Sequence, residues 1–479
     1  LKYDLKKSKE DLDKSHAKGE IGFGETSWNG IERVTVDSIL DGTHGFDPGI
    51  PPLYGYKGNE EALVLYHEGS EPTDSNDPFG ACKDVDVVVT KRNALGHCLV
   101  LMEHYKAGYV SRFMRVGRTG KMGLSLNNSF AKMGTGSNDD GGGDRSVPLT
   151  QSKQHWDALS KYFNSFEGMT NKLKPILSNI ARDNTVVVMV ANAGVLELLT
   201  NFVCAANSRN IDISNIVMFA TDEEGKKVAE ELGLAVFYDE GMFENVPKQH
   251  AGAYGDRVFT ALMLVKVISV HLCMALGYNV LFQDVDIVWL RDPLPYLQDE
   301  TKHGDFDCYF EDDGARSARY APWSANSGFY YLKNNDRTMY LITSLLYSSD
   351  QIAMHHSHQQ ALSHILNDHS TYYGLSLKVL SKELFPGGKS YHHDKPYMLK
   401  WMNGALEEEP YMFHMCWTHN KDDKLNYLQQ MGQWFLSDEC GNGEVVGRGE
   451  NGKLLDCCSA EPVVTCHFKD KPSIVKCES

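Results

Sequence analysis

Hydrophobic positions divide the chain into alternating strands and helices from about residue 150 onward. Continuous apolar runs of strand length occur at residues 185–190, 216–220, 234–238 and 279–282. Stretches with helical spacing lie between or beside them, at residues 154–182, 195–207, 223–232 and 260–276. Continuous rather than alternating apolar strands are typical of parallel sheets that helices cover on both faces. The pattern therefore predicts an α/β fold built on a mostly parallel sheet.

The first 150 residues differ in composition and in their pattern of hydrophobic positions. Residues 1–20 are dense in charge and residues 21–58 are rich in Gly and Pro, which predicts a solvated stem followed by irregular structure. Strand-like runs occur at residues 62–66, 85–90, 98–102 and 109–116, and a glycine-rich tract at 134–143 predicts a linker. We expect four parts: a charged stem and irregular segment (1–58), an accessory α/β unit with its linker (59–150), the main α/β domain (151–436), and a cysteine-rich tail (437–479).

The charge balance excludes one class of partner. The chain carries 64 acidic and 47 basic residues, a net charge of −17, and lacks a basic stripe interleaved with aromatics, so we expect no nucleic-acid binding. Because no run of 18 apolar residues occurs, we expect no membrane span in this sequence. The chain begins at Leu1 rather than Met, which leaves room upstream for a signal peptide or membrane anchor.

Cysteines gather near the end of the chain. One possible pairing has three disulfide bonds among six C-terminal cysteines and a fourth between Cys82 and Cys98. It leaves Cys204, Cys273 and Cys308 as buried thiols. The rival interpretation is a zinc site, but no C-x-x-C pair with a matching second pair is present. We favour disulfides, which predict an oxidising compartment. The six C-terminal cysteines are Cys416, Cys440, Cys457, Cys458, Cys466 and Cys477.

Two aspartates stand at the carboxyl end of the strand predicted at residues 279–282. Gly277 closes the preceding helix, and strand alternation would place Asp284 and Asp286 on the same side. Ligands of open α/β sheets bind outside the carboxyl ends of the strands, where two carboxylates can hold a hard divalent cation. A bare Asp-x-Asp pair is also common at strand ends that reach water. The pair alone therefore leaves both interpretations open.

The residues around this pair resemble a known family. Residues 277–294 are similar, nearly position for position, to the G-Y-x-V-L-x-x-D-x-D-x-V-W-L-x-x-P-L run of glycosyltransferase family 77. These are nucleotide-diphospho-sugar transferases of plants, algae and protists. The resemblance covers about residues 180–436 and implies the GT-A fold, a Rossmann-like, mostly parallel sheet with helices on both faces. It also implies a nucleotide-sugar donor, which we expect to be UDP-linked.

The resemblance also implies roles for particular residues. Asp286 and His414 would ligate a metal, and Asp284 would share it or contact the ribose; Mn²⁺ (or Mg²⁺) suits such a set, with Mn²⁺ favoured because of the nitrogen ligand. A lone histidine is more often a core residue bonded to backbone. The donor-binding residues would be Asn192, Arg257, Lys266, Asp284, Asn326, Ser327, Gly328, Lys421 and Lys424. Surface charges would equally explain Arg257 and Lys266, and a simple turn would explain Asn326 and Gly328.

One position departs from the family pattern. Members carry an Asp-Gln pair on the helix after the N-[ST]-G turn, whereas this chain has His358 and Gln359 there. We expect Gln359 to act with Asp284 and Asp286 in catalysis, but the position of the usual carboxylate holds a histidine. The neighbouring histidines would suit a second metal, although exposed histidines on a solvated helix face are the commoner explanation.

Two functions compete. The first is a metal-dependent, retaining transferase of the Golgi lumen or the secreted fraction, which moves galactose or a pentose from a nucleotide-sugar to a glycan or glycoprotein acceptor. The second is a catalytically silent protein of the same fold, acting as a binding or structural component of an extracellular assembly. The Asp284, Asp286 and His414 set favours the enzyme. His358 favours the silent protein.

Overall fold

A computed structural model describes residues 149–317, 320–437, 440, 451–465 and 471–474, together with short strands before residue 133. The chain divides into two compact units. The first contains residues 1–169, 339–354 and 371–374, and the second contains residues 170–338, 355–370 and 375–479. The four domain boundaries expected from the sequence remain a prediction. The glycine-rich tract at 134–143 lies outside the described residues.

The first unit holds a sheet whose strands pair in the order β1-β4-β5-β3-β6-β2, with β7 added beside β6. The strand-like runs of the sequence fall in this sheet, and β3 pairs with β5 in parallel. The strands are β1 (Ile31–Arg33), β2 (Phe46–Pro48), β3 (Glu61–Leu65), β4 (Asp86–Thr90), β5 (Cys98–Leu101), β6 (Arg112–Arg118) and β7 (Phe130–Lys132).

The second unit is built on a sheet of the order β10-β9-β8-β11-β14-β13-β15. Strands β10, β9, β8 and β11 run parallel, as do β13 and β15, whereas β14 is antiparallel to both of its neighbours. The predicted α/β class with a mostly parallel sheet is therefore confirmed. The strands are β8 (Thr185–Ala191), β9 (Ile216–Ala220), β10 (Ala235–Phe237), β11 (Asn279–Gln283), β13 (Cys308–Asp312), β14 (Ala325–Leu332) and β15 (Leu377–Val379).

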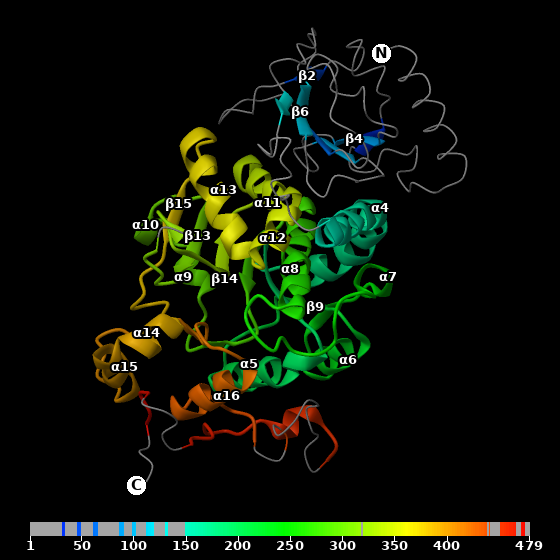
Figure 1. The fold of residues 1–479 in the computed structure, drawn as a ribbon. Helices are drawn as coiled ribbons and strands as arrows, with labels where there is room; N and C mark the ends of the chain where they lie inside the picture. The colour runs from blue at the N-terminus through cyan, green and yellow to red at the C-terminus, as the bar shows by residue number, and fades with distance from the viewer. Residues whose placement is uncertain are drawn as a thin grey trace, which may run out of the picture. The chain divides into compact units, whose positions relative to one another are not determined.

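The connections of this sheet create a switch point between β8 and β11. From β8 the chain passes through α5 (Leu196–Ser208) to β9, and through α6 (Glu223–Glu231) to β10, moving away in one direction. It then returns through α8 (Arg257–Ala275) to β11, on the other side of β8. Right-handed crossovers in opposite directions put their helices on opposite faces, and Figure 1 shows α8 across the sheet from α5 and α6. Ligands bind at such switch points, outside the strand ends.

The helices begin and end where the sequence signals it. Asp222 caps α6 and Asp256 caps α8, each accepting a backbone N–H, and Gly277 takes a φ of +94° just after α8. The other elements are α4 (Leu149–Ile180), η1 (Ala193–Val195), α7 (Glu240–Phe243), β12 (Ile287–Trp289), α9 (Leu294–Leu297), α10 (Glu300–His303), α11 (Asp336–Tyr347), α12 (Ser349–His355), α13 (His358–Tyr372), α14 (Gly388–His393), α15 (Lys395–Met402), β16 (Met412–His414), α16 (Lys421–Gln430) and η3 (Leu454–Cys457).

Helix α8 is apolar almost throughout, in contrast to the absence of a membrane span expected from the sequence. Among the described residues it is the one helix long and apolar enough to cross a membrane, with 61% of its apolar window buried. A core helix passes the same test, so the finding is weak evidence for a span.

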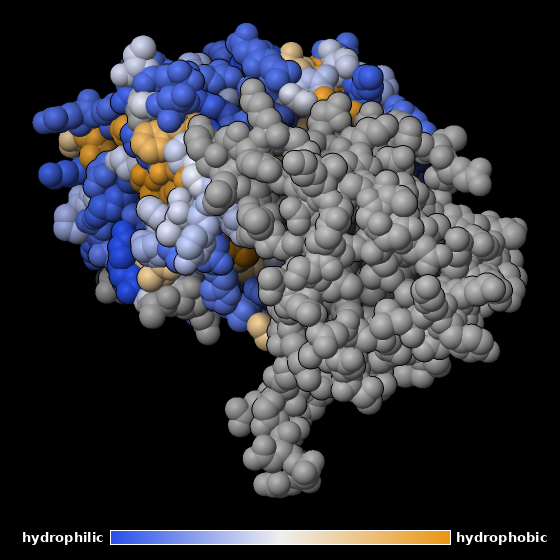
Figure 2. Space-filling view, turned by 90° about the horizontal axis from the view of Figure 1, so that it is seen from above, coloured by the Kyte–Doolittle hydropathy of each residue, from blue (hydrophilic) through white to orange (hydrophobic). Residues whose placement is uncertain are grey.

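On the face drawn in Figure 2, hydrophilic residues cover most of the described surface and apolar residues form small separate groups.

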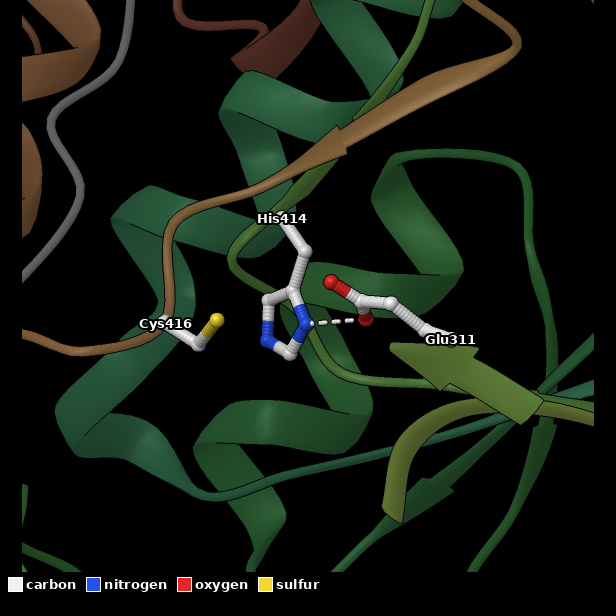
Figure 3. Close-up of side chains that lie close together, drawn as sticks. All are labelled: Glu311, His414 and Cys416. Carbon is white, nitrogen blue, oxygen red and sulfur yellow. Dashed lines mark hydrogen bonds and ion pairs between the residues drawn. The ribbon is translucent and has the colours of Figure 1, made fainter. Parts of the chain in front are cut away.

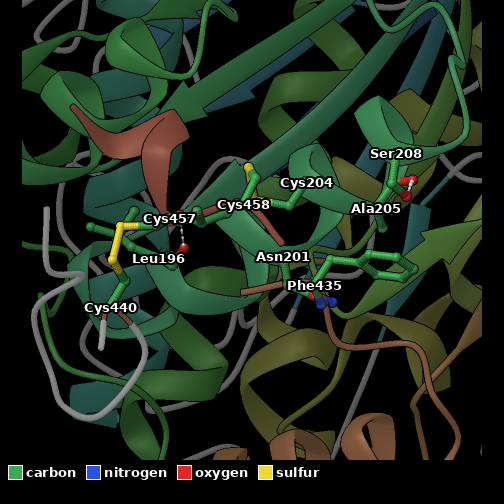
Figure 4. The surroundings of a disulfide bond; sticks show 10 residues. Leu196, Asn201, Cys204, Ala205, Ser208, Phe435, Cys440, Cys457 and Cys458 are labelled. Carbon is green, nitrogen blue, oxygen red and sulfur yellow. Dashed lines mark hydrogen bonds between the residues drawn. A yellow bond between two sulfur atoms is a disulfide. The ribbon is translucent and has the colours of Figure 1, made fainter. Parts of the chain in front are cut away.

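Two disulfides join the tail to the core and to itself. Cys204 on α5 bonds Cys458 across a sequence separation of 254 residues, and Cys440 bonds Cys457 (Figure 4). Disulfides are thus confirmed, but the expectation that Cys204 is a free thiol is wrong, because the tail packs against α5. Cys416 is free, so its expected place in a bridge is also wrong. The side chains of Cys82, Cys98, Cys466 and Cys477 lie outside the described part.

Candidate functional site

A cavity of about 410 Å³ opens beside the carboxyl end of β11 in the second unit. Its lining combines acidic, basic and imidazole groups with amides, hydroxyls and aromatic rings. The lining residues include Lys266, Asp284, Asp286, His414 and Lys424; Asp313, Asn326, Ser327, Gly328, His358 and Gln359; and Tyr254, Tyr320 and Trp417. The cavity therefore lies at the switch point, where the topology predicts a ligand.

The two aspartates converge through a turn. Strand β11 ends at Gln283, and residues 284–286 form the turn that leads into β12. The expectation that strand alternation aligns the carboxylates is therefore wrong, although the two groups do approach each other. The backbone N–H of Asp284 donates to the carbonyl of Gly328 at 2.8 Å, which ties the turn to β14.

A two-stranded pairing brings His414 to the same place. Strand β16 runs antiparallel to β12 with His414 opposite Ile287, and the N–H of Met415 donates to the carbonyl of Asp286. The His414 Nε2 lies 3.4 Å from Asp286 Oδ1. One ligand atom from each of Asp284, Asp286 and His414 lies within 4.8 Å of the others. Two carboxylates and one imidazole in this arrangement fit a hard or borderline divalent cation such as Mn²⁺ or Mg²⁺.

Two lysines face the aspartates. Lys266 from α8 donates to Asp284 Oδ1 at 2.6 Å, and Lys424 from α16 pairs with Asp286 Oδ2. Burial alone would raise the pKa of Asp286, but the charges of Lys424 and His414 outweigh it and hold that pKa well below its ordinary value. The same pairing raises the pKa of Lys424 against the effect of its burial. The site therefore presents an ionised Asp286 carboxylate beside the Lys424 ammonium group.

His414 also contacts Glu311 from β13. Its Nδ1 lies 2.7 Å from Glu311 Oε2, and Cys416 lies on the other side of the ring (Figure 3). Burial raises the pKa of Glu311 to about 7, against the opposing charge of His414. Burial would lower the pKa of His414, but the charges of Glu311 and Asp286 raise it well above its ordinary value. An imidazolium therefore bridges two carboxyl groups when nothing else binds Nε2.

The Asn326-Ser327-Gly328 segment of β14 forms a tight wall. The Asn326 Nδ2 donates to Asp313 Oδ1 at 2.8 Å, while its Oδ1 accepts the N–H of Gly328 at 2.6 Å. The N–H of Ser327 donates to Gln359 Oε1 at 3.1 Å. A Cβ at Gly328 would lie 2.5 Å from His414 Cε1 and 2.8 Å from Asp284 Oδ2. The glycine therefore leaves the space that the ligand-type side chains need.

His358 adds no negative charge to the cavity. It is 2% exposed at the start of α13, and its Nδ1 lies 2.8 Å from Met263 Sδ. Burial, helped by the charge of Lys266, lowers the pKa of His358 to about 3, so the ring is neutral near pH 7. The carboxylate on this wall is instead Asp313, whose pKa burial raises. Sequence reasoning missed Asp313 because nothing near it in the chain resembles a site.

Three residues expected at the donor site do not line the cavity. Asn192 is fully buried at the end of β8 and donates to the carbonyls of Pro247 and Gln249, so its amide holds a loop. Arg257 is exposed at the first turn of α8. Lys421 is buried and donates to Glu197 Oε2 at 2.7 Å. Asp284, Asp286, His414, Lys266, Lys424, Asn326, Ser327, Gly328 and Gln359 do lie together along the cavity.

Comparisons with known proteins find similar sugar transferases. Residues 212–428 match the model of the nucleotide-diphospho-sugar transferase family. The Beta-arabinofuranosyltransferase RAY1 of Arabidopsis thaliana is 26% identical over 55% of this chain and 50% of that protein. The UDP-galactose:fucoside alpha-3-galactosyltransferase of Dictyostelium discoideum is 24% identical over 54% of this chain and 44% of that protein. The expected resemblance to these transferases is confirmed.

The chain spans about half the length of these two curated relatives, 50% and 44%. Among solved structures, mouse Xyloside xylosyltransferase 1 matches 49% of this chain and 98% of its own at 13% identity, with a TM-score of 0.33. The galactosyltransferase LgtC, in complex with donor and acceptor sugar analogs, matches 48% of this chain and 86% of its own at 14% identity, with a TM-score of 0.31.

Proposed function

We propose that this chain is a metal-dependent, retaining glycosyltransferase that moves galactose or a pentose from a UDP-linked donor to a glycan or glycoprotein acceptor. The observation that carries the proposal is the convergence of Asp284, Asp286 and His414 beside a cavity at the switch point of the sheet. All three residues lie in the region that matches the transferase family. The printed names of relatives that use UDP-galactose and UDP-D-xylose support the choice of donor.

The residues divide the work as their contacts suggest. Asp284, Asp286 and His414 would hold Mn²⁺ or Mg²⁺, which when bound neutralises charge on the departing diphosphate. Lys266 and Lys424 already reach these carboxylates, so their ammonium groups can turn to phosphate oxygens when a cation takes over the acidic side chains.

The sugar would lie along the wall formed by β14 and the start of α13. Ser327 and Gly328 offer a close-packed backbone there, and Gln359 Oε1 already accepts the N–H of Ser327. Retention requires the acceptor hydroxyl to approach from the face that the diphosphate leaves, so donor and acceptor must be held on one side. We assign Gln359 to that wall, together with Asp313, which is the carboxyl group lining the cavity there in place of His358.

The disulfides support a location in the secretory pathway, in the Golgi lumen or outside the cell. Cys204–Cys458 and Cys440–Cys457 fasten the tail, and such bonds persist in oxidising compartments.

The test is transfer or hydrolysis of UDP-galactose and UDP-xylose by Asp286→Ala and by the wild type with and without EDTA. Loss of several kcal/mol of transition-state stabilisation predicts a fall in kcat/KM of at least about a hundredfold in both cases. The control is Asp305→Asn, because this aspartate is 78% exposed on the surface. Activity that survives both the chelator and Asp286→Ala would contradict the proposal.

A silent protein of the same fold is the second candidate, and the neutral His358 in place of a carboxylate favours it. Calorimetric titration with UDP in the presence of Mn²⁺ separates the two. The enzyme should bind UDP only when the metal is present. A scaffold that has lost its site should bind neither UDP nor Mn²⁺.

A further inference from the structure

Glu311 is a buried carboxylate without an evident structural purpose. It is 0% exposed on β13, at the point where the register between β13 and β14 shifts after Phe310. Such an irregularity re-aims a side chain relative to regular pleating. One of its oxygens, Oε2, lies 2.7 Å from His414 Nδ1, as Figure 3 shows. The side chain therefore reaches out of the sheet to one nitrogen of one imidazole.

The other carboxylate oxygen is costly. Glu311 Oε1 has no hydrogen-bond partner among the described residues, and a Cβ at Gly387 would lie only 2.4 Å from it. A buried carboxyl with an unsatisfied oxygen costs free energy of folding, and an apolar side chain of the same size would avoid that cost. Because this destabilising carboxyl group lies beside the ligand-type residue His414, its position points to a role of Glu311 in the site rather than in stability.

The contact determines what the other ring nitrogen does. When Nδ1–H donates to a carboxylate, the lone pair that remains for a metal is on Nε2. In this structure Nε2 is the nitrogen that faces Asp286, at 3.4 Å from Oδ1. Without an acceptor at Nδ1, the ring can adopt the other tautomer or turn about its Cβ–Cγ bond, and either change removes the lone pair from the aspartates.

We propose that Glu311 is the positioning residue that fixes His414 with Nδ1–H donating and Nε2 directed at Asp284 and Asp286. The metal-binding consequence rests on the proposed function, whereas the hydrogen bond itself does not. The first experiment therefore uses the metal-free protein. In ¹⁵N-histidine-labelled chain, the Nδ1–H of His414 gives a downfield, exchange-protected proton signal, assigned by its loss in His414→Asn. We expect the signal to disappear in Glu311→Leu, and a signal that persists there overturns the proposal.

The second experiment measures Mn²⁺ affinity in the full chain by electron paramagnetic resonance, for wild type, Glu311→Gln and Glu311→Leu. Loss of such an outer partner costs about 10–100-fold in metal affinity, so we expect Leu to weaken binding by that factor and Gln, which keeps a neutral acceptor, to lie between. Asp305→Asn is the control, because its carboxylate is 78% exposed and pairs with Lys333, neither of which lines the cavity, and the affinity of this variant should stay within about twofold.

Stability distinguishes positioning from a structural role. Glu311→Leu should keep or raise the melting temperature while it weakens Mn²⁺ binding; a variant that loses stability and keeps its affinity would show a structural role. If the wild type binds no Mn²⁺, the proposed function fails while the proton signal still tests Glu311. A third outcome would also overturn the inference: a sulfur-to-cobalt charge-transfer band in the Co²⁺ protein that vanishes in Cys416→Ser, because Glu311, His414 and Cys416 would then form a separate metal site.

Discussion

The substitution Gly328→Ala tests the site through space alone. An added Cβ would lie 2.5 Å from His414 Cε1, 2.8 Å from Asp284 Oδ2 and 3.0 Å from Asn326 Oδ1. Ordinary carbon–carbon contacts are about 3.5–4.0 Å, so the imidazole must retreat by about 1 Å. It cannot do so freely, because its ring is 3% exposed and Nδ1 is held by Glu311 at 2.7 Å. The methyl group therefore displaces a ligand-type residue without removing any polar group.

The expected effects are large on function and modest on stability. Overpacking of this kind costs about 1–3 kcal/mol of folding free energy. Misplacing a site group by about 1 Å can lower activity about a hundredfold. We therefore expect kcat/KM for the UDP-sugar to fall by about that factor and Mn²⁺ binding to weaken with it. The assays are initial rates over a Mn²⁺ series, direct Mn²⁺ titration, and thermal unfolding of the same samples.

The matched control is Gly168→Ala on α4, where an added Cβ meets nothing within 4 Å. A helical Gly→Ala change stabilises by up to about 1 kcal/mol, so this variant should keep full activity and an equal or slightly higher melting temperature. Wild-type Mn²⁺ affinity and turnover in a folded Gly328→Ala protein would refute the assignment of His414 and Asp284 to one metal site.

Two further predictions concern buried charge. The pKa of His358 is about 3 in the folded protein and about 6.5 in the unfolded chain. Between these values only the unfolded chain takes up the proton, so the free energy of unfolding decreases as the pH is lowered. Relative to His358→Gln, the wild type should lose about 1.4 kcal/mol per pH unit below about pH 6.5 in denaturant titrations at pH 7.5 and 5.5; parallel losses in the two proteins would contradict a neutral buried ring. Lys421→Met should cost about 3–5 kcal/mol because it leaves the buried carboxylate of Glu197 without that ammonium, and Glu197→Leu in the same chain should recover most of it. If Lys421→Met instead lost UDP affinity at unchanged stability, Lys421 would be a donor-binding residue.

Much of the second unit could be predicted because its signals are local. Strands β8, β9 and β11 are continuous apolar runs, and their interiors are buried. Gly277 ends α8 with the positive φ that its sequence position suggests. The connections between these elements then fix where the strand ends meet, so the position of Asp284 and Asp286 follows from the order of strands and helices.

The missed features all depend on contacts between distant residues. The Cys204–Cys458 bond spans 254 residues, and an apolar neighbourhood around Cys204 is equally typical of a buried free thiol. Asn192 has the strand-end position of a ligand-binding residue, but the 247–249 segment folds back and uses its amide. Glu311 sits in a strand that reads as core. Its purpose becomes visible only when β16 places His414 beside it.

The pairing of β12 with β16 is therefore the feature on which the site most depends. His414 stands opposite Ile287, and all three residues of each strand are buried. A slip of one residue in this register would turn His414 to the other face of the pair, away from both Asp286 and Glu311. The apolar neighbours Met412 and Phe413, both 0% exposed, resist such a slip because it would force each of them into a closely packed space that fits another side chain. Ordinary hydrophobic packing in β16 thus holds the imidazole where the carboxylates can share it.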